Sequence, residues 1–414
     1  MAPRWTVDVI VIGSGPAGAT AARELASLGH RVVLLTRPAP KPALAETIPP
    51  STNKLLQKLG WLRDMEAAGF VRTTGNTVYW SGAAAPHDAR YAEGLLGFQV
   101  DRARFNELLI DALRRSGCDL IADATVIATQ HNVVRFVRDD HEQEISAPWI
   151  LDCSGRTGVM ARQGWRRSAP GLRTLAIVGL WECSDGWALG DYTHTLVESH
   201  PEGWAWSVPI SRTQRHVTVM VDPRLTDVRA QGALIESYHA ALGRVPALGR
   251  LTQGARLVDA PFARDASPYS AHRYATHGAL LVGDAASFVD PLSSFGIKKA
   301  LASAWLASVV VNTCLTDSSV VAPALEFYEK RERAMHEVLE RQRAELARTA
   351  LGVETSEFWS SRAGREIEAE DPNEELNVEL LRGDARVREA FADLKRRESI
   401  TLVPGRTLRY VERP

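Results

Sequence analysis

The chain has 414 residues, a formal net charge of −1, 45% hydrophobic residues and 24% charged residues. This composition is typical of a globular protein of about two or three packed subdomains, and its near-zero charge gives no electrostatic case for a nucleic-acid partner. No apolar run reaches the ~18 residues of a membrane span and no signal peptide is recognised, so we expect a cytoplasmic protein. The four cysteines occur singly, without a C-x-x-C pair, and predict neither a metal site nor a disulfide framework.

The first 36 residues predict a strand, a glycine turn, a helix and a second strand. Residues 7–12 have a buried-strand pattern, residues 17–28 favour a helix, and residues 31–35 favour another strand. The glycines between them have the G-x-G-x-x-G spacing. The first glycine permits a tight turn, the second lets a diphosphate approach the backbone, and the third lets the helix pack on the strand. The N-terminus of that helix attracts the anionic diphosphate. The residues expected to bind the phosphates are Gly13, Ser14, Gly15, Pro16, Ala17 and Gly18.

The end of the second strand departs from this pattern. A carboxylate that binds ribose hydroxyls usually stands there, but this chain has Leu35-Thr36-Arg37. Either Arg37 or Glu46 would contact the adenosine ribose or a phosphate instead, and the pattern does not decide between them.

The middle of the chain alternates between helical and strand patterns. Helices are predicted at 49–70 and 101–117, with short strands at 76–100 between them. Further strands are predicted at 121–128, 133–137, 144–146 and 149–152. Residues 172–222 contain four more strand patterns separated by turns, which indicates an antiparallel sheet. Residues 226–242 predict a helix with Thr226 as its N-cap.

Residues 279–301 form the second informative segment. Residues 279–282 predict a short strand, after which Gly283 allows close approach and Asp284 presents a carboxylate to a ribityl hydroxyl. Ser293 or Ser294 would cap a helix that begins near Phe295, and its N-terminus would stabilise the anionic edge of a reduced flavin. Together with the glycine turn, this segment predicts FAD, with further contacts from Pro291, Gly296 and Ile297. Residues 293–350 are predicted to be almost wholly helical, with one further helix at 374–397.

This order of elements predicts an α/β protein. We expect a glutathione-reductase-type FAD-binding Rossmann fold with an inserted antiparallel β-sheet substrate domain and a helical C-terminal region. The predicted boundaries are 1–70, 101–165 and 266–315 for the FAD-binding parts, 71–100 and 166–265 for the substrate sheet, and 316–414 for the helical region. A single glycine-rich turn and the lack of a redox cysteine pair argue against a disulfide reductase.

These motifs resemble the FAD-dependent monooxygenases of the aromatic-hydroxylase fold, and among them the flavin-dependent halogenases and their relatives. The resemblance is carried by ETIPP at 46–50, DRARF at 101–105, DCSGR at 152–156 and WAWSVP at 204–209. It implies cofactor contacts from Glu46, Thr47, Arg102 and Val126. Trp204 and Trp206 either line the active site or pack in the core, and the spacing alone leaves both interpretations open.

One position departs from the halogenases. Their tunnel lysine, which forms the halogenating species, falls on Thr73 in the stretch 68–77. The neighbouring Arg72 cannot take its place, because an arginine stays protonated. The resemblance therefore implies oxygen transfer rather than halogenation.

Residues 75–80, with DRARF and DPLSSFGIKKAL, look closest to the flavoproteins of tryptophylquinone cofactor biogenesis, such as the maturation monooxygenases of quinohemoprotein amine dehydrogenase. This resemblance implies a flavin C4a-hydroperoxide that hydroxylates an electron-rich ring, a tryptophan of a peptide or protein substrate. O₂ would be the co-substrate, and NAD(P)H or a separate flavin reductase the electron source. The pocket candidates are Thr73, Trp80, Trp204, Trp206 and Phe295.

Two questions stay open at this point. His194, His216 and Tyr79 could each supply a general base, although a structural role is the favoured interpretation of each. The alternative functions are a tailoring hydroxylase or halogenase-like enzyme for a small or carrier-tethered aromatic, and a flavoprotein chaperone without turnover.

Overall fold

The computed structural model describes residues 7–37, 44–83, 85–169, 171–224, 233–352 and 356–364, together with a strand pair at 399–403 and 407–411. The predicted N-cap Thr226 and the predicted helix 374–397 lie outside the described residues.

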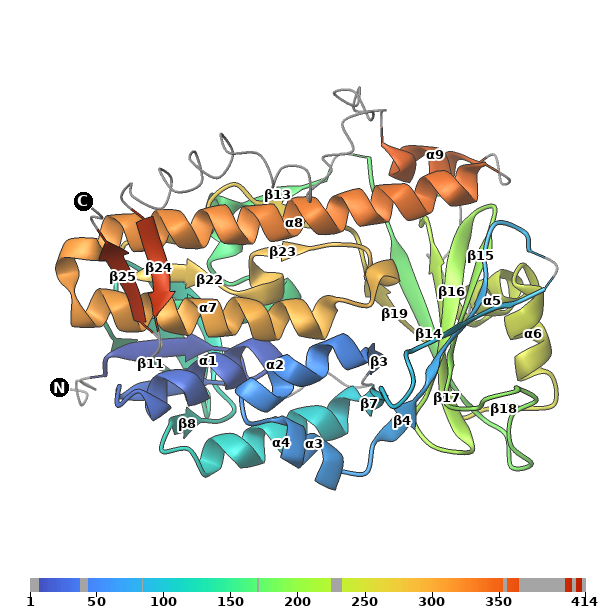
Figure 1. The fold of residues 1–414 in the computed structure, drawn as a ribbon, viewed down its shortest axis with the longest axis horizontal. Helices are drawn as coiled ribbons and strands as arrows, with labels where there is room; N and C mark the ends of the chain where they lie inside the picture. Colours follow the sequence, from blue (N-terminus) through green and yellow to red (C-terminus); the bar gives the residue numbers. More distant parts are fainter. Residues whose placement is uncertain are drawn as a thin grey trace, which may run out of the picture.

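A six-stranded sheet forms the first half of the molecule (Figure 1). Its order is β21 (Ala275–Thr276), β22 (Ala279–Leu281), β12 (Trp149–Asp152), β1 (Val9–Ile12), β2 (Val32–Leu35) and β8 (Asp119–Ile121). All neighbours from β22 to β8 pair in parallel, and only β21 is antiparallel. Every residue of β1, β2 and β12 is buried, which explains why these strands are continuous apolar runs in the sequence.

Helices cover this sheet. The helices α1 (Pro16–Ser27) and α7 (Gly296–Thr316) pack against each other, and α4 (Arg102–Arg114) packs against α1. The Asp101 side chain caps α4 by accepting a hydrogen bond from the Arg104 amide, 2.9 Å long. The predicted helical region 49–70 contains a 3-10 turn at Pro50–Thr52 followed by α2 (Asn53–Lys58) and α3 (Leu62–Ala67).

Three further sheets of the described chain have three strands each. They are formed by β3 (Ala45–Ile48), β7 (Gly97–Asp101) and β4 (Val71–Thr73), by β9 (Thr125–Gln130), β10 (Val133–Arg138) and β11 (His141–Ser146), and by β13 (Arg166–Ser168), β20 (Tyr269–Ala271) and β23 (Ser287–Phe288). The prediction of one strand at 121–128 was wrong. Residue Asp123 has a left-handed backbone, with φ of 56°, and its turn separates β8 from β9, which belong to different sheets.

An eight-stranded sheet forms the second half of the molecule. Its order is β18 (Arg256–Leu257), β14 (Leu175–Glu182), β17 (Gln214–Val221), β16 (Gly203–Pro209), β15 (Thr195–His200), β5 (Gly75–Tyr79) and β6 (His87–Arg90), with β19 (Phe262–Asp265) also paired to β14. The sheet is mixed, because β15 and β5 pair in parallel while the other pairs are antiparallel. One face packs on α5 (Ala233–Gly243) and α6 (Pro246–Thr252).

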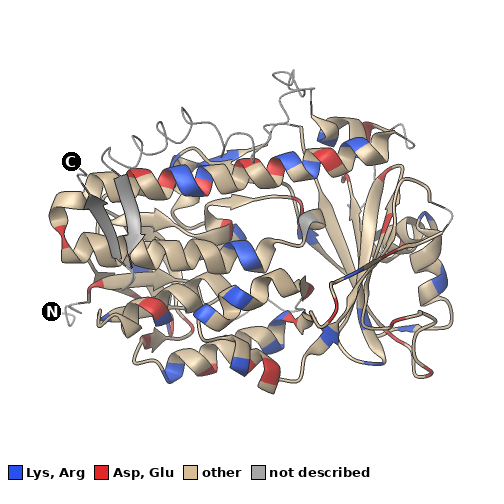
Figure 2. Ribbon diagram, in the orientation of Figure 1, with Lys and Arg blue, Asp and Glu red and all other residues tan. Residues whose placement is uncertain are grey.

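Long helices join the two halves. After α7 and a 3-10 turn at Ser318–Val320, α8 (Val321–Leu351) runs along the molecule to the short helix α9 (Glu357–Ala363) beside the second sheet (Figure 1). Acidic and basic residues alternate along α8 (Figure 2). The strands β24 (Ser399–Val403) and β25 (Thr407–Val411) pair with each other. Among the described helices α7 alone is long and apolar enough to cross a membrane, and 78% of its apolar window is buried inside the protein.

The predicted serine cap of α7 was wrong. The helix begins at Gly296 with Phe295 as its N-cap and no side-chain cap. Ser294 has a left-handed backbone, with φ of 53°, which is incompatible with the extended conformation of an N-cap residue. Asp290 instead accepts a hydrogen bond from the Leu292 amide and caps the preceding 3-10 turn, Pro291–Ser293.

Candidate functional site

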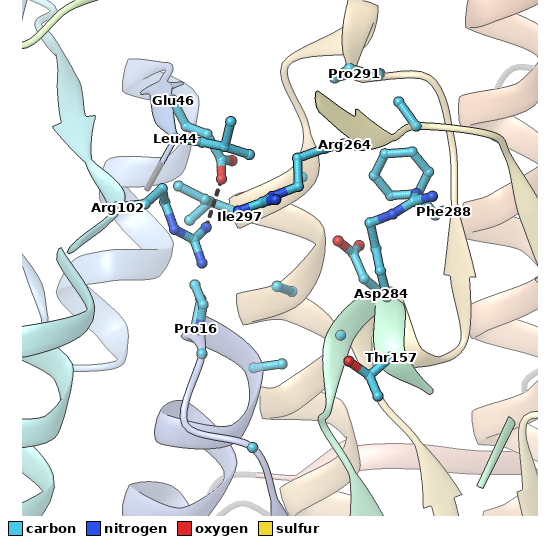
Figure 3. A pocket seen from close by; sticks show the side chains of 18 of the residues that line it. Pro16, Leu44, Glu46, Arg102, Thr157, Arg264, Asp284, Phe288, Pro291 and Ile297 are labelled. Atoms are coloured by element: carbon cyan, nitrogen blue, oxygen red, sulfur yellow. Dashed lines mark hydrogen bonds and ion pairs between the residues drawn. The ribbon is translucent and has the colours of Figure 1, made fainter. Parts of the chain in front are cut away.

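A cavity of about 2170 Å³ lies between the parallel sheet and one face of the eight-stranded sheet. Its wall includes the glycine turn, the start of α4 and the start of α7 (Figure 3). Alternate residues of the second sheet complete it. Of the predicted cofactor residues, the following line it: Gly13, Ser14, Gly15, Pro16, Ala17, Arg37, Glu46, Thr47, Arg102, Val126, Asp284, Pro291, Gly296 and Ile297. Gly18 and Gly283 lie behind the wall.

The glycine turn has the geometry of a phosphate cradle. A Cβ atom at Gly18 would lie 1.8 Å from the carbonyl oxygen of Gly13, so only glycine lets α1 approach the turn. Gly15 has no heavy atom within 4 Å of its Cβ position, and no side chain caps α1 there. The first amides of α1 are therefore available to a diphosphate, and the residues present fit FAD.

Polar side chains extend this site on both sides of the turn. The hydroxyls of Ser14 and Thr36 lie 2.6 Å apart, and Arg37 donates to Thr157 Oγ1 at 2.9 Å. Glu46 and Arg102 form an ion pair of 2.7 Å on the cavity wall (Figure 3). Because Glu46 is held by Arg102, Arg37 is the freer of the two candidates for the adenosine ribose or phosphate.

The second motif brings a buried lysine into the wall. Asp284 points into the cavity (Figure 3), and its Oδ1 lies 3.2 Å from Nζ of Lys299, which also donates to the Ser287 carbonyl. Behind Lys299, burial raises the pKa of Glu332 to about 7, an effect that Lys299 and Ser303 oppose. Lys299 was not among the residues predicted for the site. The sequence did offer a signal, because Lys299 follows Gly296 by three residues and therefore lies on the same, mainly apolar, face of the helix.

The sheet wall contributes aromatic and polar side chains. Trp204 and Trp206 stack with ring centroids 4.6 Å apart, and both line the cavity together with His216 and Thr218. The intervening residues Val217 and Val219 face the helices on the other side, so strand alternation sets which side chains reach the cavity. Trp204 also belongs to a core cluster, and both interpretations of the tryptophan motif therefore apply to it.

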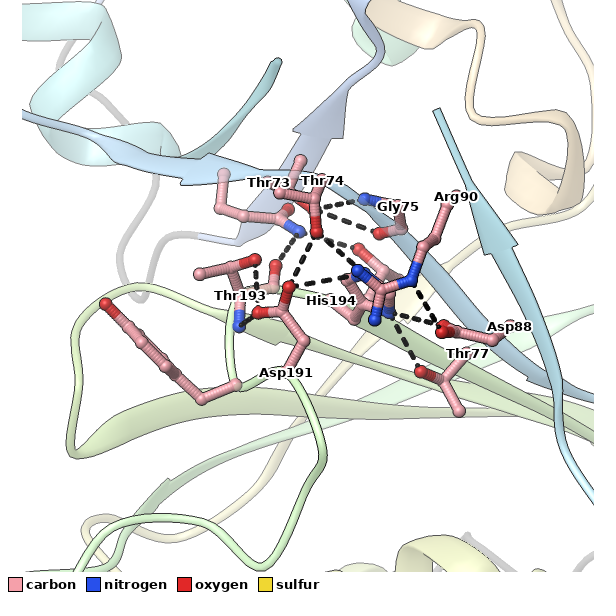
Figure 4. Close-up of polar contacts among 12 residues, drawn as sticks. Thr73, Thr74, Gly75, Thr77, Asp88, Arg90, Asp191, Thr193 and His194 are labelled. Carbon is pink, nitrogen blue, oxygen red and sulfur yellow. Dashed lines mark hydrogen bonds and ion pairs between the residues drawn. The ribbon is translucent and has the colours of Figure 1, made fainter. Parts of the chain in front are cut away.

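The three candidate bases have different locations. His216 lines the cavity, its Nδ1 is buried without a hydrogen-bond partner, and burial lowers its pKa. His194 contacts the hydroxyls of Thr74 and Thr77 and the carboxylate of Asp88 at 2.9, 3.0 and 3.1 Å (Figure 4). Neither His194 nor Tyr79 is part of the lining that the structure describes.

Two predicted pocket residues, Thr73 and Trp80, are also outside the described lining, whereas Phe295 is part of it. The hydroxyl of Thr73 is buried and donates to the Gly75 carbonyl at 2.9 Å. Trp80 donates from Nε1 to Thr349 Oγ1 at 3.1 Å and packs edge-on against Trp359. Over the described ranges, no cluster of three or more His, Cys, Asp or Glu side chains could hold a metal ion.

Comparisons with known proteins agree with this geometry. Residues 6–342 match the FAD binding domain family. The chain is 29% identical over 348 residues to a tryptophan 2-halogenase of Chondromyces crocatus, a match that covers 78% of this chain and 65% of that protein. It is 26% identical over 358 residues to a 1H-pyrrole-2-carbonyl-[peptidyl-carrier protein] chlorinase of Pseudomonas fluorescens, covering 78% and 79%.

Solved structures show the same fold. The myxobacterial chondrochloren halogenase CndH has a TM-score of 0.82 at 27% identity, covering 95% of this chain and 90% of CndH. The peptidyl tryptophan dihydroxylase QhpG has a TM-score of 0.73 at 24% identity, covering 87% and 80%, a likeness that concerns the fold alone.

The chain belongs to the FAD binding domain family and has the mixed α/β fold of the flavin-dependent halogenase structures, as predicted. The predictions of FAD as cofactor and of an oxidoreductase that uses FAD and O₂ are confirmed at the level of this halogenase and monooxygenase family. The predicted domain boundaries and individual cofactor contacts stay predictions.

Proposed function

We propose that the protein is an FAD-dependent monooxygenase that hydroxylates an electron-rich aromatic ring, a tryptophan side chain of a protein precursor in tryptophylquinone biogenesis. The observation that carries this proposal is Thr73. By the sequence resemblance it stands where the halogenases have their tunnel lysine, and its hydroxyl donates to the Gly75 carbonyl. Lys299 is the only lysine among the described residues that line the cavity. Its ammonium contacts Asp284 and Ser287.

The chain's own residues would bind the cofactor, orient the ring and exclude water. Bound and reduced, FAD would supply the two electrons that activate O₂, of which one oxygen atom enters the ring and the other leaves as water. Trp204 and Trp206 offer aromatic faces to an incoming indole, and His216, whose pKa burial lowers, would be a neutral acceptor for its N–H. The two tryptophan rings, with Ala176 and Val197 on the same sheet, would keep water away from the reacting ring.

A peptide substrate is supported by the extent of the cavity. Its lining includes residues 259–268, which belong to none of the predicted cofactor motifs and offer room beside the cofactor. QhpG, with the same fold, is a peptidyl tryptophan dihydroxylase. The cytoplasmic location expected from the sequence stays a prediction.

Halogenation is the second candidate. It is favoured by the stacked Trp204 and Trp206 in the cavity wall and by the two halogenases that match most of the chain. In this case the substrate would be a free or carrier-tethered aromatic.

Mass spectrometry of reaction products distinguishes these functions. The protein is incubated with FAD, O₂, chloride or bromide, and a flavin reductase with NADH, and is offered a tryptophan-containing peptide or free tryptophan. We expect one or two oxygen atoms on the peptide and no halogen. A chlorine or bromine isotope pattern would establish the halogenase function. If oxidised product forms without the reductase, NAD(P)H is the direct electron donor. If the protein with substrate consumes O₂ no faster than free reduced flavin does, only the role of a chaperone without turnover is left.

A further inference from the structure

Five arginines line the part of the cavity that runs from the end of the DCSGR motif to residues 259–268, and none of them is among the residues predicted to bind the cofactor. They are Arg156, Arg162, Arg166, Arg173 and Arg264. The segments that carry them, 156–173 and 259–268, contribute two carboxylates to the same wall, Asp259 and Asp265. Arg264 reaches into the cavity from β19 (Figure 3). Positive charge therefore exceeds negative charge in this part of the lining.

Two of these guanidinium groups rest on a platform of stacked aromatic rings. Tyr269 and Phe288 are neighbours across β20 and β23, with ring centroids 6.0 Å apart and an interplanar angle of 25°. The guanidinium carbon of Arg156 lies 3.9 Å from the Phe288 centroid, and that of Arg166 lies 3.8 Å from the Tyr269 centroid. Stacking on a ring fixes a guanidinium while leaving the N–H groups at its edge available.

Several of those N–H groups are buried and unpaired. Arg156 donates from Nη2 to the Ser267 carbonyl at 3.3 Å, and Arg166 donates from Nη1 to the Arg156 carbonyl at 2.9 Å. Nη1 of Arg156 and both Nε and Nη2 of Arg166 are buried without a hydrogen-bond partner. A buried charged donor without a partner costs free energy, so this pattern indicates a ligand with acceptor oxygens.

The charges around the pair are incompletely balanced. Asp265 lies 3.6 Å from Nη2 of Arg156, and no carboxylate within the described ranges comes within ion-pair distance of Arg166. Burial lowers the pKa of Arg166, and repulsion from Arg162 and Arg156 lowers it further, against attraction from Tyr269 and Asp152. An added anion would relieve this repulsion.

We propose that Arg156 and Arg166 form a subsite for an oxyanion, a carboxylate or phosphate, carried by the molecule whose aromatic ring enters the cavity. The residues of this subsite are not those of the diphosphate cradle at the glycine turn. This inference rests on the proposed function in one respect, because it assigns the anion to the substrate of that cavity. An acidic side chain beside the tryptophan of a peptide would supply a carboxylate, and a tether would supply a phosphate.

Binding to the FAD-loaded protein without O₂ tests the proposal independently of turnover. Arg166→Gln is compared with wild type and with Arg331→Gln, an exposed arginine on α8. The probes are a short peptide with one tryptophan flanked by glutamates, the matched peptide flanked by glutamines, and inorganic pyrophosphate. We expect wild type and Arg331→Gln to bind an anionic probe about tenfold more tightly than Arg166→Gln does.

The probes also identify the source of the oxyanion. If the glutamate peptide loses about tenfold in affinity and the glutamine peptide does not, the anion is a carboxylate. If pyrophosphate alone loses affinity, it is a phosphate. Equal binding of every probe to wild type and Arg166→Gln would overturn the proposal. So would an equal loss of FAD affinity, because Arg166 would then belong to the cofactor site.

Arg166→Lys covers the case in which the glutamine variant does not fold. It keeps the charge and loses the planar fork, so a folded lysine variant should bind the anionic probe with reduced affinity and FAD with unchanged affinity. Unchanged binding of the anionic probe by that variant would contradict a forked oxyanion site. A failed hydroxylation assay with this binding pattern intact would count against the proposed function alone.

Discussion

The two ends of the cavity are built in different ways. At the cofactor end, the contacts come from short contiguous segments at the carboxyl ends of parallel strands, such as residues 13–17 after β1. At the sheet end, they come from alternate residues on separate strands, such as Trp206 on β16 and His216 on β17. The first end depends on backbone geometry and the second on strand register, so the same size of change should have different consequences at each.

A methyl group at the third glycine should have the largest effect. In Gly18→Ala the new Cβ would lie 1.8 Å from the Gly13 carbonyl oxygen, where only backbone movement can relieve the clash. We expect a loss of about 3 kcal/mol or more in unfolding free energy, measured by urea denaturation. Gly15→Ala is the matched control, since its Cβ meets no heavy atom within 4 Å. It should fold normally and weaken FAD binding only. Equal stability of both variants would contradict the backbone argument.

Loss of the Asp284 carboxylate should mainly affect the cofactor. A charged hydrogen bond of about 1.5–3 kcal/mol predicts roughly 10- to 150-fold weaker FAD binding in Asp284→Ala, measured by fluorescence titration. Since Lys299 lies 3.2 Å from Asp284, the loss of this carboxylate would also leave the lysine charge unbalanced, a second way to weaken FAD binding. The double variant Asp284→Ala/Lys299→Met separates the two causes. Recovery of FAD affinity in the double variant would assign the loss to Lys299.

The difference between the two ends of the cavity also explains which site residues could be predicted from the sequence. The glycine turn and the segment around Asp284 were predictable, because turn and strand patterns are local. Lys299 and Arg166 were not, because their roles depend on which elements face the cavity. The parallel pairing of β15 with β5 joins residues such as Leu196 and Thr77, far apart in the chain, and no local pattern specifies it. Thr73 and Trp80 were predicted to line the pocket but are outside the described lining. Their positions also depend on how distant strands pair.

The second sheet should be the more acid-sensitive region. Burial, together with Arg244, lowers the pKa of His200 from 6.5 to about 4. Below about pH 6.5 the unfolded chain binds a proton that the folded protein does not bind until about pH 4, so stability falls as the pH decreases through this window. Between pH 7 and pH 5 this group should cost about 2 kcal/mol. Urea midpoints of wild type, His200→Gln and the exposed-residue control His141→Gln measure it. A pH dependence unchanged in His200→Gln would refute this assignment.

The smallest effect is expected at His216, where the sheet end meets the proposed chemistry. His216→Gln removes a ring that lines the cavity but leaves the strand pairing of β17 intact. We expect turnover of the tryptophan peptide to fall about tenfold, near 1.4 kcal/mol, with FAD affinity and stability nearly unchanged. His194→Gln should lower stability and leave turnover nearly unchanged, since His194 is buried among Thr74, Thr77 and Asp88 and lies outside the described lining.

The pH profile of turnover tests His216 further. Because burial lowers the pKa of His216, wild-type turnover should persist at pH 6.5 and decrease only at lower pH, as the ring becomes protonated and can no longer accept a proton. If His216→Gln shows the wild-type rate and the same pH profile, His216 is a structural residue, as we expect His194 to be.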